Sequence, residues 1–280
     1  MVKENLQEEI KKFINYHIEQ EYSTNTIRQY EHVINQFIRW IPKEEILNKQ
    51  LCINYKKYLE STNLKYSSIN NWITILNKFF KSIKREDLIL QKFKIQKAFA
   101  IEYALTNTDY KRLLRFCKIK EDYQTYFIIK ILTKTGIRIN ELNYFTVENL
   151  SSFIEIKSKG KIRMIFVPKD LVRELRKYAR ENNIKKGTLF PSMKKDGMIT
   201  YSCIWKRLKS IAGMARVNKK PTHSHSFRHL YAVNFLDQYP NDIAHLADLL
   251  GHKQLETTRS YGKLTENQML SMVEKIKFNK

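Results

Sequence analysis

The sequence predicts a mainly α-helical protein with a small antiparallel β-hairpin, divided into an N-terminal helical bundle and a C-terminal α+β domain. Length, glycine distribution and apolar spacing predict this division. A chain of 280 residues exceeds one average domain and is too short for three large ones. All seven glycines lie between Gly136 and Gly262, although average usage of roughly 7% would place about nine in the preceding stretch. A long glycine-free stretch favours helices, because glycine is a poor helix former.

Apolar spacing predicts about four helices in the N-terminal part. Apolar side chains recur at three- and four-residue intervals, which places them on one face of a helix. Residues that can cap a helix N-terminus stand before two of these runs, at Ser23-Thr24-Asn25-Thr26 and at Ser67-Ser68. Four such helices would form a bundle. The expected helices span about residues 5–18, 27–38, 45–60 and 69–83.

The C-terminal part combines helices with the hairpin. Thr106-Asn107-Thr108 begins one expected helix, and a buried helix is expected over about 122–135. Two β-rich runs, 153–156 and 164–167, predict short strands around a turn at Lys159-Gly160-Lys161. We expect an N-terminal domain at 1–95, a C-terminal domain at 96–280, and a charged connector across this boundary at 85–100.

The chain is strongly basic, with 51 Lys and Arg against 28 Asp and Glu, a net charge of +23. Residues 1–97 carry a net charge of +6, and residues 98–280 carry +17. Such a field attracts polyanions, so nucleic acid is the favoured partner. A lysine-rich solubility surface, or basic drift in an AT-rich genome, is the alternative explanation. The hydrophobic content of 42% argues against a disordered chain.

Cysteines and apolar runs bear on the cellular compartment. Cys52, Cys117 and Cys203 form no CxxC pair, which argues against a zinc knuckle or a disulfide framework. The N-terminus lacks the apolar core of a secretory signal, and no run approaches the ~20 apolar residues that span a bilayer. We expect a cytoplasmic, nucleoid-associated protein with reduced thiols.

Four separate clusters carry residue types suited to chemistry on a phosphate. The first is TGIRINEL, in which Arg138 and Glu141 stand three apart, a spacing that lets both lie on one helical face. Alone, such a pair is usually a surface ion pair worth little. The second is the hairpin turn SKGKIR, whose lysines could equally protect a strand edge.

The third cluster is rich in histidine, and the fourth ends in a tyrosine. His223, His225 and His229 could bind zinc, but Arg228 among them would repel a cation and suits a phosphate better. The fourth cluster is LLGH followed, nine residues after its histidine, by Tyr261. A lone tyrosine is an ordinary aromatic residue, so its interpretation depends on the other clusters.

In this order, the clusters resemble the motifs of the tyrosine recombinase family, which includes phage integrases and Xer-like site-specific recombinases. The family pattern is Arg in TGxRxxEL, Lys in a hairpin, HxxR, LGH, and Tyr nine residues later. The hairpin departs from the common GKGxKxR by one residue, which leaves its lysine ambiguous: Lys159 is the first choice, Lys161 the reserve and Lys157 the third. The resemblance implies six catalytic residues: Arg138, Lys159, His225, Arg228, His252 and the nucleophile Tyr261, with Glu141 in support.

These residue types fit phosphoryl transfer by physical argument as well. Arginines Arg138 and Arg228 offer planar, permanently charged donors to the nonbridging oxygens of the transition state, and His252 adds a hydrogen bond. Tyrosine ionises near pH ~10 and needs a cationic pocket or a base, for which the family implies His225. A hairpin lysine would protonate the leaving 5′-oxygen. No GxxxxGK[ST] loop or carboxylate cluster is present, so neither ATP, another cofactor nor a metal is expected.

The resemblance also implies partners and a fold. It implies a SAM-like core-binding bundle and a catalytic domain clamped around double-stranded DNA with an inverted-repeat core site. Dimers on each site and a tetramer in the synapse would exchange strands through a Holliday junction. Residues 264–278 have the apolar spacing of a terminal helix, which either docks on a neighbouring protomer or packs on its own domain.

Several functions remain open at this point. Resolution of replicon dimers or transposon cointegrates is favoured by the absence of a visible arm-binding domain. Integration or excision of a mobile element is the main alternative. A topoisomerase with the same tyrosine chemistry, a non-catalytic DNA-binding protein, and a basic RNA-binding or scaffold protein are further alternatives.

Overall fold

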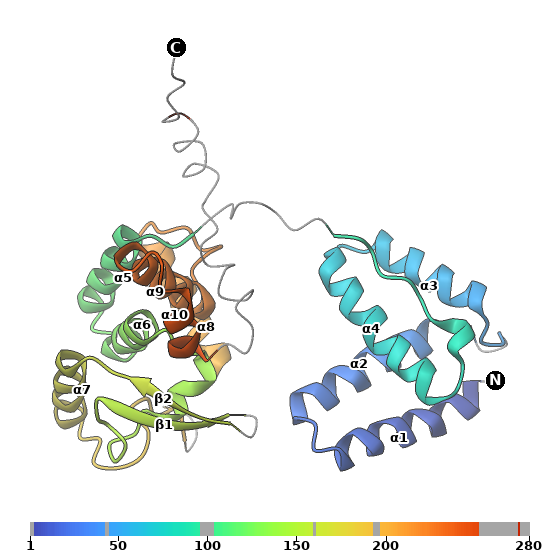
Figure 1. Ribbon diagram of the computed structural model, residues 1–280, viewed down its shortest axis with the longest axis horizontal. Helices are drawn as coiled ribbons and strands as arrows, with labels where there is room; N and C mark the ends of the chain where they lie inside the picture. The colour runs from blue at the N-terminus through green and yellow to red at the C-terminus, as the bar shows by residue number, and fades with distance from the viewer. Residues whose placement is uncertain are drawn as a thin grey trace. The chain divides into compact units, whose positions relative to one another are not determined.

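A computed structural model of the chain describes residues 3–42, 45–95, 104–158, 161–192, 197–251 and Glu274. Helices dominate, and the described strands form a single antiparallel pair, so the predicted fold class is confirmed. The chain divides into two compact units, residues 1–97 and 98–280 (Figure 1). Each unit has a hydrophobic core of its own.

The first unit is a four-helix bundle that buries one apolar face of each helix. Phe37 from α2 and Phe79 and Phe80 from α4 are fully buried at its centre. Helix α4 packs on each of the other three helices, because its apolar stripe is the widest of the four. The helices are α1 (Lys3–Glu19), α2 (Thr24–Trp40), α3 (Lys49–Ser61) and α4 (Tyr66–Ser82).

One of the two expected helix caps is present and the other is wrong. The Ser23 hydroxyl accepts a hydrogen bond from the Thr26 amide at 3.3 Å and caps α2. Helix α4 begins at Tyr66, earlier than expected, with Lys65 as a cap that makes no side-chain hydrogen bond. Ser68 therefore lies in the first turn, where its amide donates to the Lys65 carbonyl at 2.8 Å.

The first half of the predicted charged connector is an ordered part of the bundle. After the short 3₁₀ helix η1 (Glu86–Leu88), the chain runs beside α4. The Asn77 amide donates to the Leu90 carbonyl and accepts from the Leu90 N–H, both at 2.8 Å. Asn70, two helical turns earlier, makes the same pair of bonds to Phe93, at 2.9 and 2.8 Å. These side chains satisfy backbone groups that a lone extended segment would leave unpaired.

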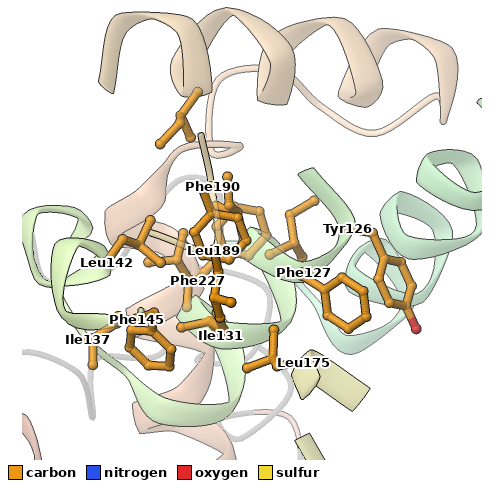
Figure 2. Packing of buried hydrophobic residues seen from close by; sticks show 14 of the residues in the cluster. Tyr126, Phe127, Ile131, Ile137, Leu142, Phe145, Leu175, Leu189, Phe190 and Phe227 are labelled. Atoms are coloured by element: carbon orange, nitrogen blue, oxygen red, sulfur yellow. The ribbon is translucent and has the colours of Figure 1, made fainter. Parts of the chain in front are cut away.

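The second unit is built around α6 (Tyr123–Thr135), with helices on several sides of it (Figure 1). Residues 125–133 of α6 are all buried, as the prediction of a buried helix at 122–135 requires. Their side chains pack with Leu142, Leu175 and Phe227 from surrounding elements (Figure 2). The surrounding helices are α5 (Asn107–Ile119), η2 (Ile139–Tyr144), α7 (Lys169–Glu181), α8 (Tyr201–Met214), α9 (Ser224–Gln238) and α10 (Ile243–Leu250).

The hairpin is longer than predicted and has one buried and one exposed face. Strands β1 (Phe153–Ser158) and β2 (Lys161–Phe166) pair with Ser158 opposite Lys161, so each extends further toward the turn than the predicted strand. Successive side chains alternate between the two faces. Ile154, Ile156 and Ile165 are buried against the domain, whereas Phe153 and Ile162 are exposed.

No helix in the described part of the chain is long and apolar enough to cross a membrane.

Gly136 is a position where the fold tolerates no side chain. It ends α6 in the left-handed conformation, with φ of +62°, and a Cβ there would lie 2.5 Å from Tyr231 Cδ1 and 2.8 Å from Leu250 Cδ2. We predict that Gly136→Ala lowers the free energy of unfolding by roughly 2–4 kcal/mol, since overpacking adds to backbone strain. Chemical denaturation of the full chain measures this.

Gly187→Ala is the matched control. Its φ is +75°, but an added Cβ meets no atom of the described residues within 4 Å. Only backbone strain applies, so the expected loss is about 1 kcal/mol. Equal losses for the two variants would contradict the packing argument.

Candidate active site

Arg138 lies just after the end of α6 and is held by Glu141. Glu141 Oε2 accepts from the Arg138 backbone N–H at 2.8 Å, and Oε1 accepts from Arg138 Nη1 at 3.3 Å. The two residues were expected on one face of an α-helix, and this is wrong, because Arg138 is the N-cap of the 3₁₀ helix η2 and Glu141 closes a capping box. The Arg138–Glu141 pair is also not a surface ion pair, because its carboxylate is buried. The Glu141 side chain is 4% exposed, while that of Arg138 is 47% exposed and faces solvent.

A second arginine shares the same carboxylate. Arg163 Nη2 donates to Glu141 Oε2 at 2.6 Å, and its Nη1 donates to the Leu249 carbonyl at 2.8 Å. Arg163 was predicted only as a residue of the hairpin motif. One signal could have found it: in β2, Arg163 lies two residues before the buried Ile165 and so shares its face, and an arginine on a buried strand face requires partners.

Arg228, from α9, is a buried cation. It is 2% exposed, and its two terminal nitrogens donate to the carbonyls of Gly136 at 2.6 Å and of Leu250 at 2.7 Å. Its guanidinium thereby joins the end of α6 to the end of α10. Removing either acceptor would leave a buried charge short of a partner, which is costly.

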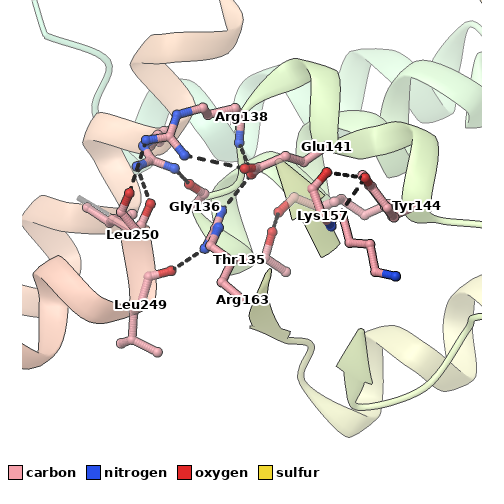
Figure 3. A network of polar contacts seen from close by, with 12 residues as sticks. Thr135, Gly136, Arg138, Glu141, Tyr144, Lys157, Arg163, Leu249 and Leu250 are labelled. Atoms are coloured by element: carbon pink, nitrogen blue, oxygen red, sulfur yellow. Dashed lines mark hydrogen bonds and ion pairs between the residues drawn. The ribbon is translucent and has the colours of Figure 1, made fainter. Parts of the chain in front are cut away.

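Three consecutive carbonyls at the C-terminal end of α10 each accept from a different arginine (Figure 3). Leu249 accepts from Arg163 and Leu250 from Arg228, while Gly251 accepts from Arg138 Nη2 at a longer 3.4 Å. The last carbonyls of a helix lack intrahelical partners and carry the negative end of its dipole. Three cations from separate elements therefore converge on one helix end.

His225 lies one turn before Arg228 in α9, and the charges of Arg228 and Arg138 act on its imidazole. Burial lowers the pKa of His225 below its usual value, and the positive charges of Arg228 and Arg138 lower it further. Burial likewise lowers the pKa of His229, with a further contribution from His225. His225 is therefore held in its neutral form beside the two arginines.

The remaining candidates lie mostly outside the described residues. Lys159, His252 and Tyr261 are in this group, and only the backbone of Lys161 is described. Lys157, the third choice, is exposed and pairs with Ile162 on the outward face of the hairpin, opposite to that of Arg163. Its backbone N–H donates to the Tyr144 hydroxyl at 3.2 Å, and that hydroxyl donates to the Lys157 carbonyl.

The zinc hypothesis gains no support from this geometry. Among the described residues, no three His, Cys, Asp or Glu side chains gather as metal ligands. The ring of His223 instead lies 3.1 Å from the Ser226 hydroxyl, within the first turn of α9.

Comparison with known proteins places this arrangement in a family. Residues 104–268 match the phage integrase family, and residues 10–87 match the SAM-like N-terminal domain of phage integrases. This chain belongs to the phage integrase family of tyrosine recombinases. The resemblance drawn from the motifs and the predicted enzyme class are both confirmed.

Several relatives of this tyrosine recombinase match along most of its length. Tyrosine recombinase XerA of Pyrococcus furiosus is 26% identical, over 90% of this chain and 88% of the relative. Tyrosine recombinase XerC of Leptospira interrogans is also 26% identical, over 97% of this chain and 94% of the relative.

Solved structures share the fold at lower identity. XerH bound to its difH substrate matches with a TM-score of 0.69 and 20% identity, over 90% of this chain and 79% of that one. A lambda integrase dimer on a core site matches with a TM-score of 0.72 and 14% identity, over 91% and 76%.

We predict that the histidine cluster makes this recombinase less stable on mild acidification. The pKa values of His223, His225 and His229 are lowered in the folded state, chiefly by burial. Below about pH 6.5 the unfolded chain binds protons that the folded chain does not, so the free energy of unfolding falls as the pH falls. Denaturation between about pH 7.5 and pH 5.5 measures the slope, and a flat or opposite slope would contradict the prediction.

An NMR titration of the His225 imidazole with a matched variant tests the cause. Arg138→Met removes one of the positive charges that lower the pKa of His225, so this pKa should rise toward its usual value. His245→Gln is the control, because His245 is exposed and its pKa is raised by Asp242 rather than lowered. A pKa of His225 that is the same in Arg138→Met would exclude the proposed charge effect.

Proposed function

We propose that this recombinase cleaves and rejoins DNA at specific sites, with Tyr261 as the nucleophile and a 3′-phosphotyrosyl intermediate. One observation carries the proposal. Arg138 and Arg228 meet at the end of α10, both lower the pKa of His225, and the sequence carries His252 and Tyr261 within the ten residues that follow Gly251. We infer that all six motif residues act on the same phosphate.

In the proposed step, one phosphoester bond forms and another breaks. The Tyr261 oxygen attacks the phosphorus and its proton passes to His225, whose neutral form can accept it. The bond from phosphorus to the 5′-oxygen breaks, and the hairpin lysine, Lys159 by preference, protonates the leaving oxygen. The phosphodiester is conserved in the tyrosyl ester, so the reverse reaction rejoins a strand without ATP or a metal.

The arginines differ in how they would meet the phosphate. Arg138 is half-exposed, and its bond to the Gly251 carbonyl is long, so a nonbridging oxygen can replace that carbonyl. Arg228 is fixed by two short bonds from opposite sides of the site. A cation held in advance stabilises developing charge without reorganisation during the reaction. His252 would supply a further hydrogen bond.

The partner in this proposal is double-stranded DNA with an inverted-repeat core site. The net charge of +23 supports a polyanionic partner. Among structural neighbours, XerH is bound to difH DNA and lambda integrase forms a dimer on a core site. We propose a dimer on each site, a tetramer in the synapse, a Holliday junction intermediate, and exchange of the terminal segment 264–278 between protomers.

For the biological role we propose resolution of replicon dimers or transposon cointegrates. The curated relatives named XerA and XerC, which match along nearly their whole length, support a compact recombinase of this kind. Integration or excision of a mobile element is the second candidate. It is favoured by similarity to the Tn1549 transposon integrase, with a TM-score of 0.70 over 95% of this chain and 98% of that one.

Tyr261→Phe tests the nucleophile. The probe is a pool of nicked duplexes with paired inverted repeats of about one helical turn each, about 10 base pairs. The wild-type chain should form an SDS-resistant protein–DNA adduct, and Tyr261→Phe should form none, because it lacks the attacking oxygen. Tyr239→Phe, which changes an exposed tyrosine outside the six motif residues, is the control and should form the adduct normally. An adduct that persists in Tyr261→Phe would contradict the assignment.

The general acid is identified by changing the leaving atom. Lys159→Ala should slow cleavage by about 10²–10⁴-fold on a normal phosphodiester, the usual range for general acid catalysis. A 5′-bridging phosphorothiolate leaves as a thiolate and requires no proton, so it should restore most of the rate. Lys161→Ala is the matched control and should cleave both substrates nearly as the wild type does. Rescue confined to Lys161→Ala would transfer the role to Lys161.

A further inference from the structure

We propose that Arg163 is a positioning residue for the reaction: it holds the buried carboxylate that orients Arg138 and, at the same time, holds the backbone from which the His252–Tyr261 segment starts. The inference rests on the proposed function and adds a residue to it. Arg163 itself touches neither substrate nor reacting atoms in this proposal.

Arg163 and Arg138 share one carboxylate, that of Glu141. Glu141 is buried, and its Oε2 accepts both from Arg163 Nη2 at 2.6 Å and from the Arg138 backbone N–H at 2.8 Å. Its other oxygen reaches Arg138 Nη1 only at 3.3 Å. Arg163 therefore takes the shorter and better buried contact. Without it, the full charge of Glu141 would draw the Arg138 guanidinium away from a phosphate.

Arg163 also contacts the backbone at the end of α10. Arg163 Nη1 holds the Leu249 carbonyl at 2.8 Å, and its Cδ and Nε lie against Gly251. A Cβ on Gly251 would meet Arg163 Cδ at 2.6 Å and Nε at 2.9 Å, so the packing at this point is direct. Arg163 Nε is buried and has no hydrogen-bond partner among the described residues, which leaves the two terminal nitrogens to fix the side chain. Gly251 immediately precedes His252 in the chain.

The residue type fits this role. A planar guanidinium can donate to a carboxylate and to a carbonyl from two nitrogens in fixed directions, which a lysine ammonium on a flexible stem does not reproduce. Arg163 also stands in β2 opposite Ile156, so it ties the hairpin that carries the candidate lysines to the same two elements. The motif glycine before His252 then has a physical reason: with φ of +62° and Arg163 against it, position 251 accommodates no side chain.

The test compares two substrates in single-turnover cleavage. One is a normal phosphodiester and the other carries a methylphosphonate, which lacks one negatively charged nonbridging oxygen, at the cleaved position. Arg163→Met should keep normal DNA affinity and lose about 100-fold in cleavage of the phosphodiester, the order expected for misplaced catalytic groups. On the methylphosphonate its deficit should shrink by about tenfold or more, because less charge needs to be neutralised. Arg173→Met, which removes an exposed arginine of α7, should match the wild type on both substrates.

Two further variants keep the proposal falsifiable if Arg163→Met is unstable. Arg163→Lys keeps the charge but not the fork, and Gly251→Ala displaces Arg163 without removing it. Both variants should lose less cleavage activity than Arg163→Met, and their loss should again be smaller on the methylphosphonate than on the phosphodiester. An equal deficit on the two substrates in these variants, or normal cleavage by a folded Arg163→Met, would overturn the positioning role. Failure of the wild-type chain to form any adduct would instead refute the proposed function, and the inference with it.

Discussion

The arrangement of the charged residues in the second unit depends on the C-terminal end of α10, where three successive backbone carbonyls accept from three arginines. Arg163, Arg228 and Arg138 reach Leu249, Leu250 and Gly251 from strand β2, helix α9 and the turn after α6. A helix end has unpaired carbonyls and a partial negative charge, so it attracts cations without a dedicated carboxylate. The arginines repel one another, and this shared acceptor, together with the buried Glu141, is what lets them stay close.

The candidate site lies next to the hydrophobic core of the second unit. Helix α6 is buried nearly all round and stops at Gly136, whose carbonyl is the second acceptor of Arg228. Tyr231 and Leu250 pack so closely on Gly136 that a methyl group would overlap both. The position of Arg228 is therefore set by core packing as well as by hydrogen bonds, and a change in either is transmitted to the cation.

These contacts leave the charged residues with different exposure and different freedom to move. Arg228 is held rigidly by carbonyls and is fully buried, whereas Arg138 is half-exposed and loosely held at its far end. His225, between these charges, has a lowered pKa and stays neutral, which suits a proton acceptor. The two arginines and His225 therefore differ in exposure, in charge and in how firmly they are held.

The family and the fold class were predictable from the amino-acid sequence alone. Apolar periodicity located the four helices of the bundle, and the ordered motifs from TGIRINEL to Tyr261 indicated the recombinase family, because both signals lie in short stretches of chain. Predictions of helix ends from capping residues were less reliable. Helix α4 begins at Tyr66 with Lys65 as its cap, and not after a serine, since burial of the apolar face outweighs a single cap.

Only the tertiary structure decided how the arginines are partnered. Arg138 meets Gly251 across 113 residues, Arg228 meets Gly136 across 92, and Arg163 meets Leu249 across 86. The acceptors in these contacts are backbone carbonyls, which every residue carries and which therefore leave no mark in the sequence. The burial of Glu141 and its contact with Arg163 depend on the same long-range packing, so the carboxylate of a pair that looked like a surface ion pair is buried between two arginines.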